Sequence, residues 1–156
     1  MNQQNPLLAP WAGPDGGYPP FDKVTIPLLE EALNLALEQS RREMEAIASN
    51  PAAPDFSNTI LALEKSGEYM DRVAPLYSVW AGSMRSPEFQ ELENRMALKL
   101  AAFRDEITQN EKLFQRIEAV YLADDKGLTS EEKRLVWLRH NHFVLSGAKL
   151  GPQAKA

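Results

Sequence analysis

The sequence contains no cysteine, only two histidines and no cluster of basic residues. The lack of cysteine excludes disulfides, thiolate nucleophiles and cysteine-based metal sites. The formal net charge is −5, and nucleic-acid phosphates require clustered cations, so we expect no nucleic-acid partner. No apolar run is long enough to span a bilayer and no signal peptide follows Met1, so we expect no membrane partner. A cytoplasmic location is predicted, or a periplasmic one if a signal peptide has been removed.

The sequence also lacks segments with the two-residue alternation of strands, which predicts an all-α fold. Prolines and glycines crowd the first twenty residues and predict an irregular lead over residues 1–24, because proline lacks an amide and fixes φ. Residues 25–156 are predicted to form one helical domain of about five helices. The short connections indicate antiparallel hairpins packed as a bundle. No fixed period of residue identity indicates a repeat array.

The first two predicted helices have clear starts. Thr25 can cap a helix that Asn50-Pro51 ends. Asp55, after Pro54, can cap a second that runs to about Met84. An interior proline costs ~3 kcal/mol unless the helix kinks, so a bend or break is expected between Asp71 and Pro75. The buried face of the first helix is predicted to hold Leu29, Leu33, Ala36, Ser40, Met44 and Ile47.

Three further helices are predicted after residue 85. Ser86-Pro87-Glu88 starts one, Asn110 caps the next, which ends at residues 124–127, and Thr129 with Glu132 forms a capping box for the last. Their inward residues are predicted to be Phe89, Leu92, Met96, Leu100, Phe103 and Ile107, then Leu113, Ile117 and Val120, and finally Leu135, Leu138, His142 or Phe143, and Leu145.

His140 and His142 form the only spacing that suggests a metal site. Residues two apart on a helix point about 200° apart, whereas the zinc motif H-E-x-x-H needs histidines four apart. We therefore interpret His140 as a core or rim residue that contacts a neighbouring carbonyl or carboxylate.

The other candidate groups favour structural roles. Adjacent carboxylates on a helix diverge, and the serines that precede Gly67 and Gly147 have no partner base at a recognisable spacing. The aromatic residues lie within apolar faces and are predicted to be in the core. The groups considered were Glu30-Glu31, Asp124-Asp125, Glu131-Glu132, Ser66, Ser146, Tyr77, Trp80 and Trp137. We predict no catalytic, cofactor-binding or metal-ligating residue here.

Short motifs along nearly the whole chain carry a family resemblance. They are Asn5-Pro6-Leu7-Leu8, Pro20-Phe21-Asp22-Lys23, Glu45-Ala46-Ile47-Ala48, Asn50-Pro51, Pro54 to Glu68, Arg134-Leu135-Val136, His140 and Phe143 to Leu150. Together they resemble the N-terminal region of the thimet-oligopeptidase family of zinc metallopeptidases, and within it the bacterial peptidyl-dipeptidases (dipeptidyl carboxypeptidases).

The resemblance implies a helical wall of a deep channel that admits short oligopeptides, in a parent enzyme that releases C-terminal dipeptides. Such enzymes bind zinc through H-E-x-x-H and a later glutamate, and the printed sequence contains no H-E-x-x-H. We therefore expect the catalytic domain, and the zinc, further along a longer parent chain, and we expect this part to be inactive by itself. Two alternatives remain open: a parent endopeptidase that resembles oligopeptidase A, and a stand-alone helical interaction module.

Overall fold

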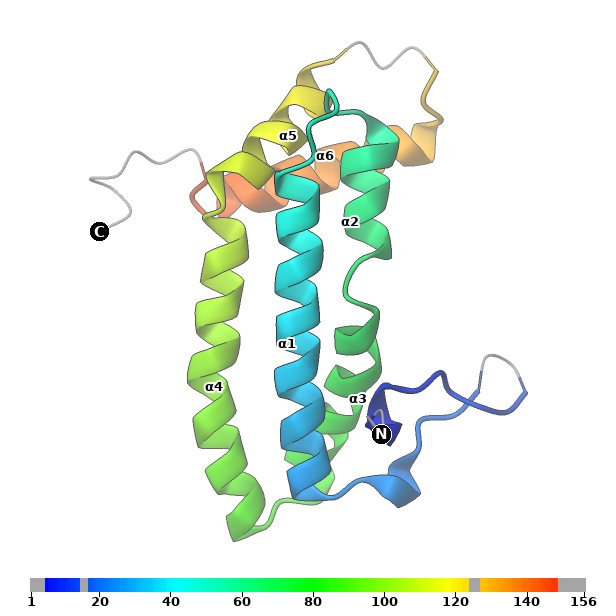
Figure 1. Cartoon of the computed structure of the whole chain (residues 1–156), viewed down its shortest axis with the longest axis vertical. Helices are drawn as coiled ribbons and strands as arrows, with labels where there is room; N and C mark the ends of the chain where they lie inside the picture. Colours follow the sequence, from blue (N-terminus) through cyan, green and yellow to red (C-terminus); the bar gives the residue numbers. More distant parts are fainter. Residues whose placement is uncertain (1–4, 15–16, 124–126, 149–156) are drawn as a thin grey trace. The chain divides into compact units, whose positions relative to one another are not determined.

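The computed structural model describes residues 5–14, 17–123 and 127–148 (Figure 1). Across these ranges the regular elements are helices, accompanied by one isolated bridge between Ala12 and Tyr18. The all-α prediction is confirmed. None of the described helices is long and apolar enough to cross a membrane. The elements are η1 (Pro6–Leu8), η2 (Phe21–Lys23), α1 (Ile26–Ala48), η3 (Phe56–Leu61), α2 (Ala62–Lys65), α3 (Glu68–Ser83), α4 (Pro87–Thr108), α5 (Glu111–Leu122) and α6 (Ser130–Leu145).

Side-chain caps fix where the helices begin, as predicted. The Ser86 hydroxyl accepts from the Phe89 amide at 3.2 Å, and the Asn110 side chain accepts from the Leu113 amide at 3.0 Å. At the start of α6, Thr129 and Glu132 form the reciprocal capping box. Each contact satisfies an amide that has no acceptor inside its own helix. The starts of α4, α5 and α6 are therefore confirmed.

The second predicted helix is interrupted, but at a different place. Asp55 caps it as expected, yet its first turns are the π-helix η3, continued by α2. The break falls at Ser66–Gly67, and α3 passes through Pro75 without interruption, so a break between Asp71 and Pro75 is wrong, whereas a bend there stays a prediction. Gly67 has a φ of 84°, a left-handed conformation that costs glycine little. The Ser66 hydroxyl donates to the Leu63 carbonyl at 2.7 Å and competes with continued helix there.

The contacts within the chain separate into two units, which are described individually. The first comprises Met1–Arg41 and Gly67–Ala102. Its N-terminal lead is irregular in part, as predicted, but η1 is firmly attached: Leu7 and Leu8 are buried. The Asn5 amide nitrogen donates to the Leu28 carbonyl at 2.9 Å, and Arg72 donates to the Leu8 carbonyl at 2.6 Å. The other buried apolar residues of this unit are Leu29, Ala32, Leu33, Ala36, Leu37, Val73, Leu76, Phe89, Leu92 and Met96.

A polar seam joins α1 to α4 within the first unit. Arg95 donates from Nε and Nη2 to both carboxylate oxygens of Glu30, at 3.0 and 2.8 Å. Lys99 donates to the Asn34 side-chain oxygen at 2.7 Å. The hydrogen bond from Arg95, helped by the charges of Arg95 and Lys99, holds the pKa of Glu30 below its usual value, although partial burial opposes this shift.

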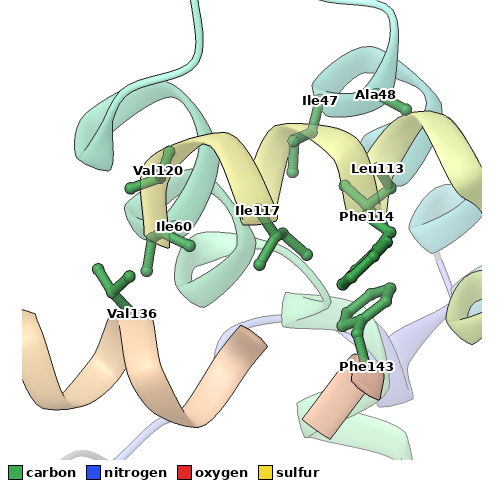
Figure 2. Close-up of a cluster of buried hydrophobic side chains, with 9 residues drawn as sticks. All are labelled: Ile47, Ala48, Ile60, Leu113, Phe114, Ile117, Val120, Val136 and Phe143. Atoms are coloured by element: carbon green, nitrogen blue, oxygen red, sulfur yellow. The ribbon is translucent and has the colours of Figure 1, made fainter. Parts of the chain in front are cut away.

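The second unit comprises Arg42–Ser66 and Phe103–Ala156, and its described part contains a compact apolar cluster. Figure 2 shows this cluster between α5, α6, the end of α1 and the η3 segment. The rings of Phe114 and Phe143 face each other with centroids 6.2 Å apart, and Val136 points toward Ile60 (Figure 2). The cluster consists of Ile47, Ala48, Ile60, Leu113, Phe114, Ile117, Val120, Val136 and Phe143.

The predicted inward faces of α1, α4 and α5 are correct, and that of α6 is correct only in part. On α4, Phe89, Leu92 and Met96 are buried, and the later residues of the predicted face are half-buried. Leu113, Ile117 and Val120 are buried on α5, and α1 buries its predicted face, with Met44 partly covered. On α6, Phe143 is buried and Leu135 partly buried, as predicted, but Leu138 and Leu145 are exposed, and Val136 and His140 are buried instead. The sequence offers α6 two apolar stripes on opposite sides, and contact with α5 and η3 decides between them.

The α6 assignment predicts opposite outcomes for two nearby substitutions. Phe143→Ala removes a ring from the cluster and should lower the free energy of unfolding of this chain by about 3–5 kcal/mol. Leu145→Ala should change it by no more than about 0.5 kcal/mol, because that side chain is 79% exposed. Urea unfolding followed by far-UV circular dichroism measures both values. Equal losses would contradict the assignment.

The Glu30–Arg95 pair predicts a specific acid sensitivity. Because the folded-state pKa of Glu30 lies below 4.5, the pair stabilises the fold fully above about pH 4.5, and this contribution disappears as the pH falls through the lowered pKa. Glu30→Gln should therefore lose less stability than the parent sequence between pH 5 and pH 3. The expected difference is small, because both side chains are partly exposed. Glu131→Gln, at an exposed position, is the matched control in the same pH series of urea titrations.

Candidate functional site

The two histidines lie on different sides of α6. His140 is 8% exposed and faces α5, whereas His142 is exposed. Among the described residues, no three His, Asp or Glu side chains are arranged to hold a metal ion. The described side chains therefore do not fit the zinc that the family resemblance implies. The pair cannot supply two ligands to one ion from these positions.

His140 lies at the edge of the core, as the sequence predicted. Its ring lies parallel to that of Tyr121, with centroids 3.9 Å apart, and stacks more loosely on Phe114 at 5.9 Å. Its Nε2 atom lies 3.9 Å from a carboxylate oxygen of Glu118. All three neighbours belong to α5, so His140 fastens α6 to α5 through ring stacking and an adjacent carboxylate.

Several of the paired carboxylates, and one of the two serines, have structural partners. Glu30 binds Arg95, and Glu31 accepts from the Asn5 side chain at 2.8 Å. Glu132 belongs to the capping box of α6, and Glu131 is exposed in the same first turn. Ser66 donates to a backbone carbonyl, and Ser146 follows the last turn of α6. Asp124-Asp125 lie outside the described residues. No interaction of the described members of these pairs, or of the two serines, joins them to a base or a second acid.

The aromatic residues are less buried than predicted. Tyr77 and Trp80 are half-buried, and Trp137 is 47% exposed, so the core assignment of Trp137 is wrong. Tyr77 packs on Phe89 with ring centroids 5.5 Å apart, and burial together with the nearby charge of Glu93 raises the pKa of its hydroxyl.

Trp11 in the lead adjoins two cavities within the first unit. One has a volume of 320 Å³ and is lined by residues of the lead, and the other, of 330 Å³, also meets α3 at Glu68, Asp71 and Arg72. The indole Nε1 of Trp11 is buried and makes no hydrogen bond within the described structure. Solvent does not reach this atom, so it offers no contact point for a molecule in either cavity.

Arg116 is a buried and highly connected polar side chain, which sequence reasoning missed. It is 7% exposed and lies on the same side of α5 as Leu113 and Val120. Its Nη1 donates to the carbonyls of Asn50 and Ala52 at 2.7 and 3.0 Å. Its Nη2 donates to the side-chain oxygen of Asn58 at 2.8 Å, with a longer contact to Thr59 Oγ1 at 3.4 Å. One guanidinium therefore fastens the whole 50–59 segment to α5.

Asn58 forms the other half of this arrangement. Its side-chain oxygen accepts from the Asp55 amide at 3.0 Å as well as from Arg116, and its side-chain nitrogen donates to the Ala53 carbonyl at 2.8 Å. Asp55 in return accepts from the Asn58 amide at 2.7 Å. A charged residue between apolar positions of a predicted inward face was the available signal for Arg116, because such a residue needs partners when it is buried.

The proteins that this chain matches are carboxypeptidases. It is 39% identical over 161 aligned residues to a dipeptidyl carboxypeptidase of Escherichia coli (strain K12), an alignment that covers 100% of this chain and 23% of that protein. It is also 39% identical over 139 residues to a dipeptidyl carboxypeptidase of Salmonella typhimurium (strain LT2), which covers 88% of this chain and 20% of that protein. The resemblance to the bacterial dipeptidyl carboxypeptidases is thereby confirmed. No protein-family model matches the chain.

The chain spans about a fifth to a quarter of the length of the curated relatives it matches. The described side chains of this span form helix caps, ion pairs and an apolar core, and they assemble no metal centre. The similarity therefore concerns a portion of the relatives, and the activity of a whole protein does not follow from it directly.

The Arg116 contacts predict that replacing this residue lowers stability, and that a lysine, which keeps the charge, does not restore it fully. Arg116→Met should lower the free energy of unfolding by about 1.5–3 kcal/mol, because several oxygens lose a charged donor. Arg116→Lys should recover only part of this loss, since an ammonium group cannot reach acceptors on both sides of the segment as a guanidinium does. Urea titrations measure the losses, with the exposed Arg104→Met as the control. A Lys variant as stable as the parent sequence would contradict this role for the guanidinium.

Proposed function

We propose that these 156 residues form the helical, non-catalytic part of a longer zinc peptidyl-dipeptidase that releases dipeptides from the C-termini of short oligopeptides. The observation that carries the proposal is the 39% identity to a dipeptidyl carboxypeptidase over the whole chain. The proposed parent acts in the cytoplasm, or in the periplasm if its complete chain carries a signal peptide. Its partners would be the catalytic domain of the same chain and the peptide substrate.

The positions of the two histidines favour a non-catalytic role for this span. His140 is stacked between rings and His142 points to a different side of the helix, so neither is available as part of an i, i+4 ligand pair. The zinc, which would polarise the scissile peptide bond, must then be held by residues outside this span. What these residues supply is shape and rigidity.

Rigidity has a clear physical source in the second unit. Arg116 and Asn58 hold the irregular segment before η3 through several hydrogen bonds, and the apolar cluster packs η3 against α5 and α6. A channel wall that excludes folded proteins has to keep its form when a peptide binds. We infer that the second unit serves as such a wall, which restricts access and helps to orient the peptide.

The test uses the complete parent protein and two peptides of one sequence, one with a free C-terminus and one amidated. The dipeptidase should release a dipeptide from the free peptide and act far more slowly on its amidated twin, because recognition of the terminal carboxylate is lost. Mass spectrometry of the products over time measures both rates. The 156-residue chain alone serves as the control and should release nothing.

Two results would redirect the assignment. Equal cutting of both peptides at internal bonds, without dipeptide release, replaces it by the endopeptidase that resembles oligopeptidase A. Release of dipeptides by the 156-residue chain alone overturns the non-catalytic role. If the complete reading frame contains no zinc motif and cuts neither peptide, the interaction module is the remaining function.

A further inference from the structure

Helix α6 carries a second apolar stripe that the described structure leaves uncovered. Leu138 and Leu145 are 43% and 79% exposed, and the neighbouring Trp137 is 47% exposed. Leu138 and Leu145 are seven residues apart and so lie on one face of the helix. Figure 2 shows Val136 and Phe143 of the same helix within the core cluster. Leu145, two residues beyond Phe143, therefore points about 200° away from that core.

This outer stripe differs from the scattered apolar residues that any surface contains. Leu98 on α4 is 78% exposed, but it stands alone among polar and small residues, as single surface leucines commonly do. On α6 two leucines repeat at helical spacing beside an indole, which is the pattern of a face that is covered by another element. The helix is thus apolar toward its own core and again on the opposite side.

Charged and titratable groups border the stripe. Arg134 and His142 are exposed and lie one turn before and one turn after Leu138, on the same face. Neither forms an ion pair within the described residues. A surface that covers the stripe would therefore need apolar side chains at its centre and acidic ones toward Arg134 and His142.

We propose that the outer stripe of α6 (Trp137, Leu138 and Leu145) is a docking surface for a part of the parent chain that lies outside these 156 residues. The proposal rests on the longer parent of the proposed function. The length of the relatives supports this occupant, because more than three quarters of the E. coli protein lies outside the aligned region. A covering segment from the same chain also has a high effective concentration, so a small apolar stripe suffices to hold it.

The experiment is hydroxyl-radical footprinting of the complete parent protein, read by mass spectrometry. In this chain alone Trp137 is only partly buried, so its oxidation there should be only about twofold slower than in the denatured chain. Docking should slow it at least about tenfold, and the leucines of the stripe should be protected as well. Leu98 is the internal control and should keep the rate of an exposed leucine.

A double variant tests whether the stripe itself causes the protection. Leu138→Glu with Leu145→Glu should raise the oxidation rate of Trp137 in the parent at least about fivefold, whereas Leu98→Glu should leave it unchanged. Far-UV circular dichroism verifies that both variants remain folded. Oxidation of Trp137, Leu138 and Leu145 at the rates of exposed side chains in the unsubstituted parent would overturn the proposal.

Two further outcomes are separable from this one. Protection that disappears on dilution, together with a dimer in analytical ultracentrifugation, assigns the stripe to a second copy and overturns the proposal. Absence of dipeptide release with the protection intact overturns the dipeptidase assignment and leaves the docking surface in place.

Discussion

The second unit depends on one buried guanidinium. Arg116 donates only to neutral oxygens, two of them backbone carbonyls of a segment that has no regular structure of its own. A buried charge is costly unless hydrogen bonds replace its hydration, and here several do so. The same contacts provide hydrogen bonds for backbone carbonyls of the loop, which would otherwise need water as their partner. Helix α5 therefore serves both as a wall of the core and as the anchor of the irregular chain that enters η3.

That anchor decides which side of α6 faces inward. With η3 held against α5, Ile60 lies in the cluster and meets Val136, and the two phenylalanine rings close the other end (Figure 2). His140 then completes the contact by stacking on Tyr121. Packing against two elements at once selects one of the two apolar stripes of α6. The other stripe becomes available for contacts of a different kind.

The sequence was most informative where structure is local. Ser86, Asn110 and Thr129 act within one turn of the helix they cap, so residue types and spacing sufficed to predict those starts. The inward face of α6 depends on contacts with residues far away in the chain. The place of the break before α3 depends on whether the helix is interrupted at Gly67 or at Pro75, and the left-handed conformation of Gly67 decides it. Spacing within one segment cannot weigh such contacts. The roles of the histidines followed from helix geometry, whereas the partners of Arg116 required the fold.

The π-helix η3 has a consequence for how this region can change. A turn closed by i→i+5 bonds holds one residue more than the α-helical turn beside it. Removing one residue within η3 would let the turn revert to ordinary α geometry and would leave the flanking residues close to their present orientation, because the extra residue of the π turn absorbs the deletion. A deletion in α2, which has no extra residue to lose, would rotate Asn58 by about 100° relative to the residues that follow it. The loss of one residue should therefore be tolerated better within η3 than within α2.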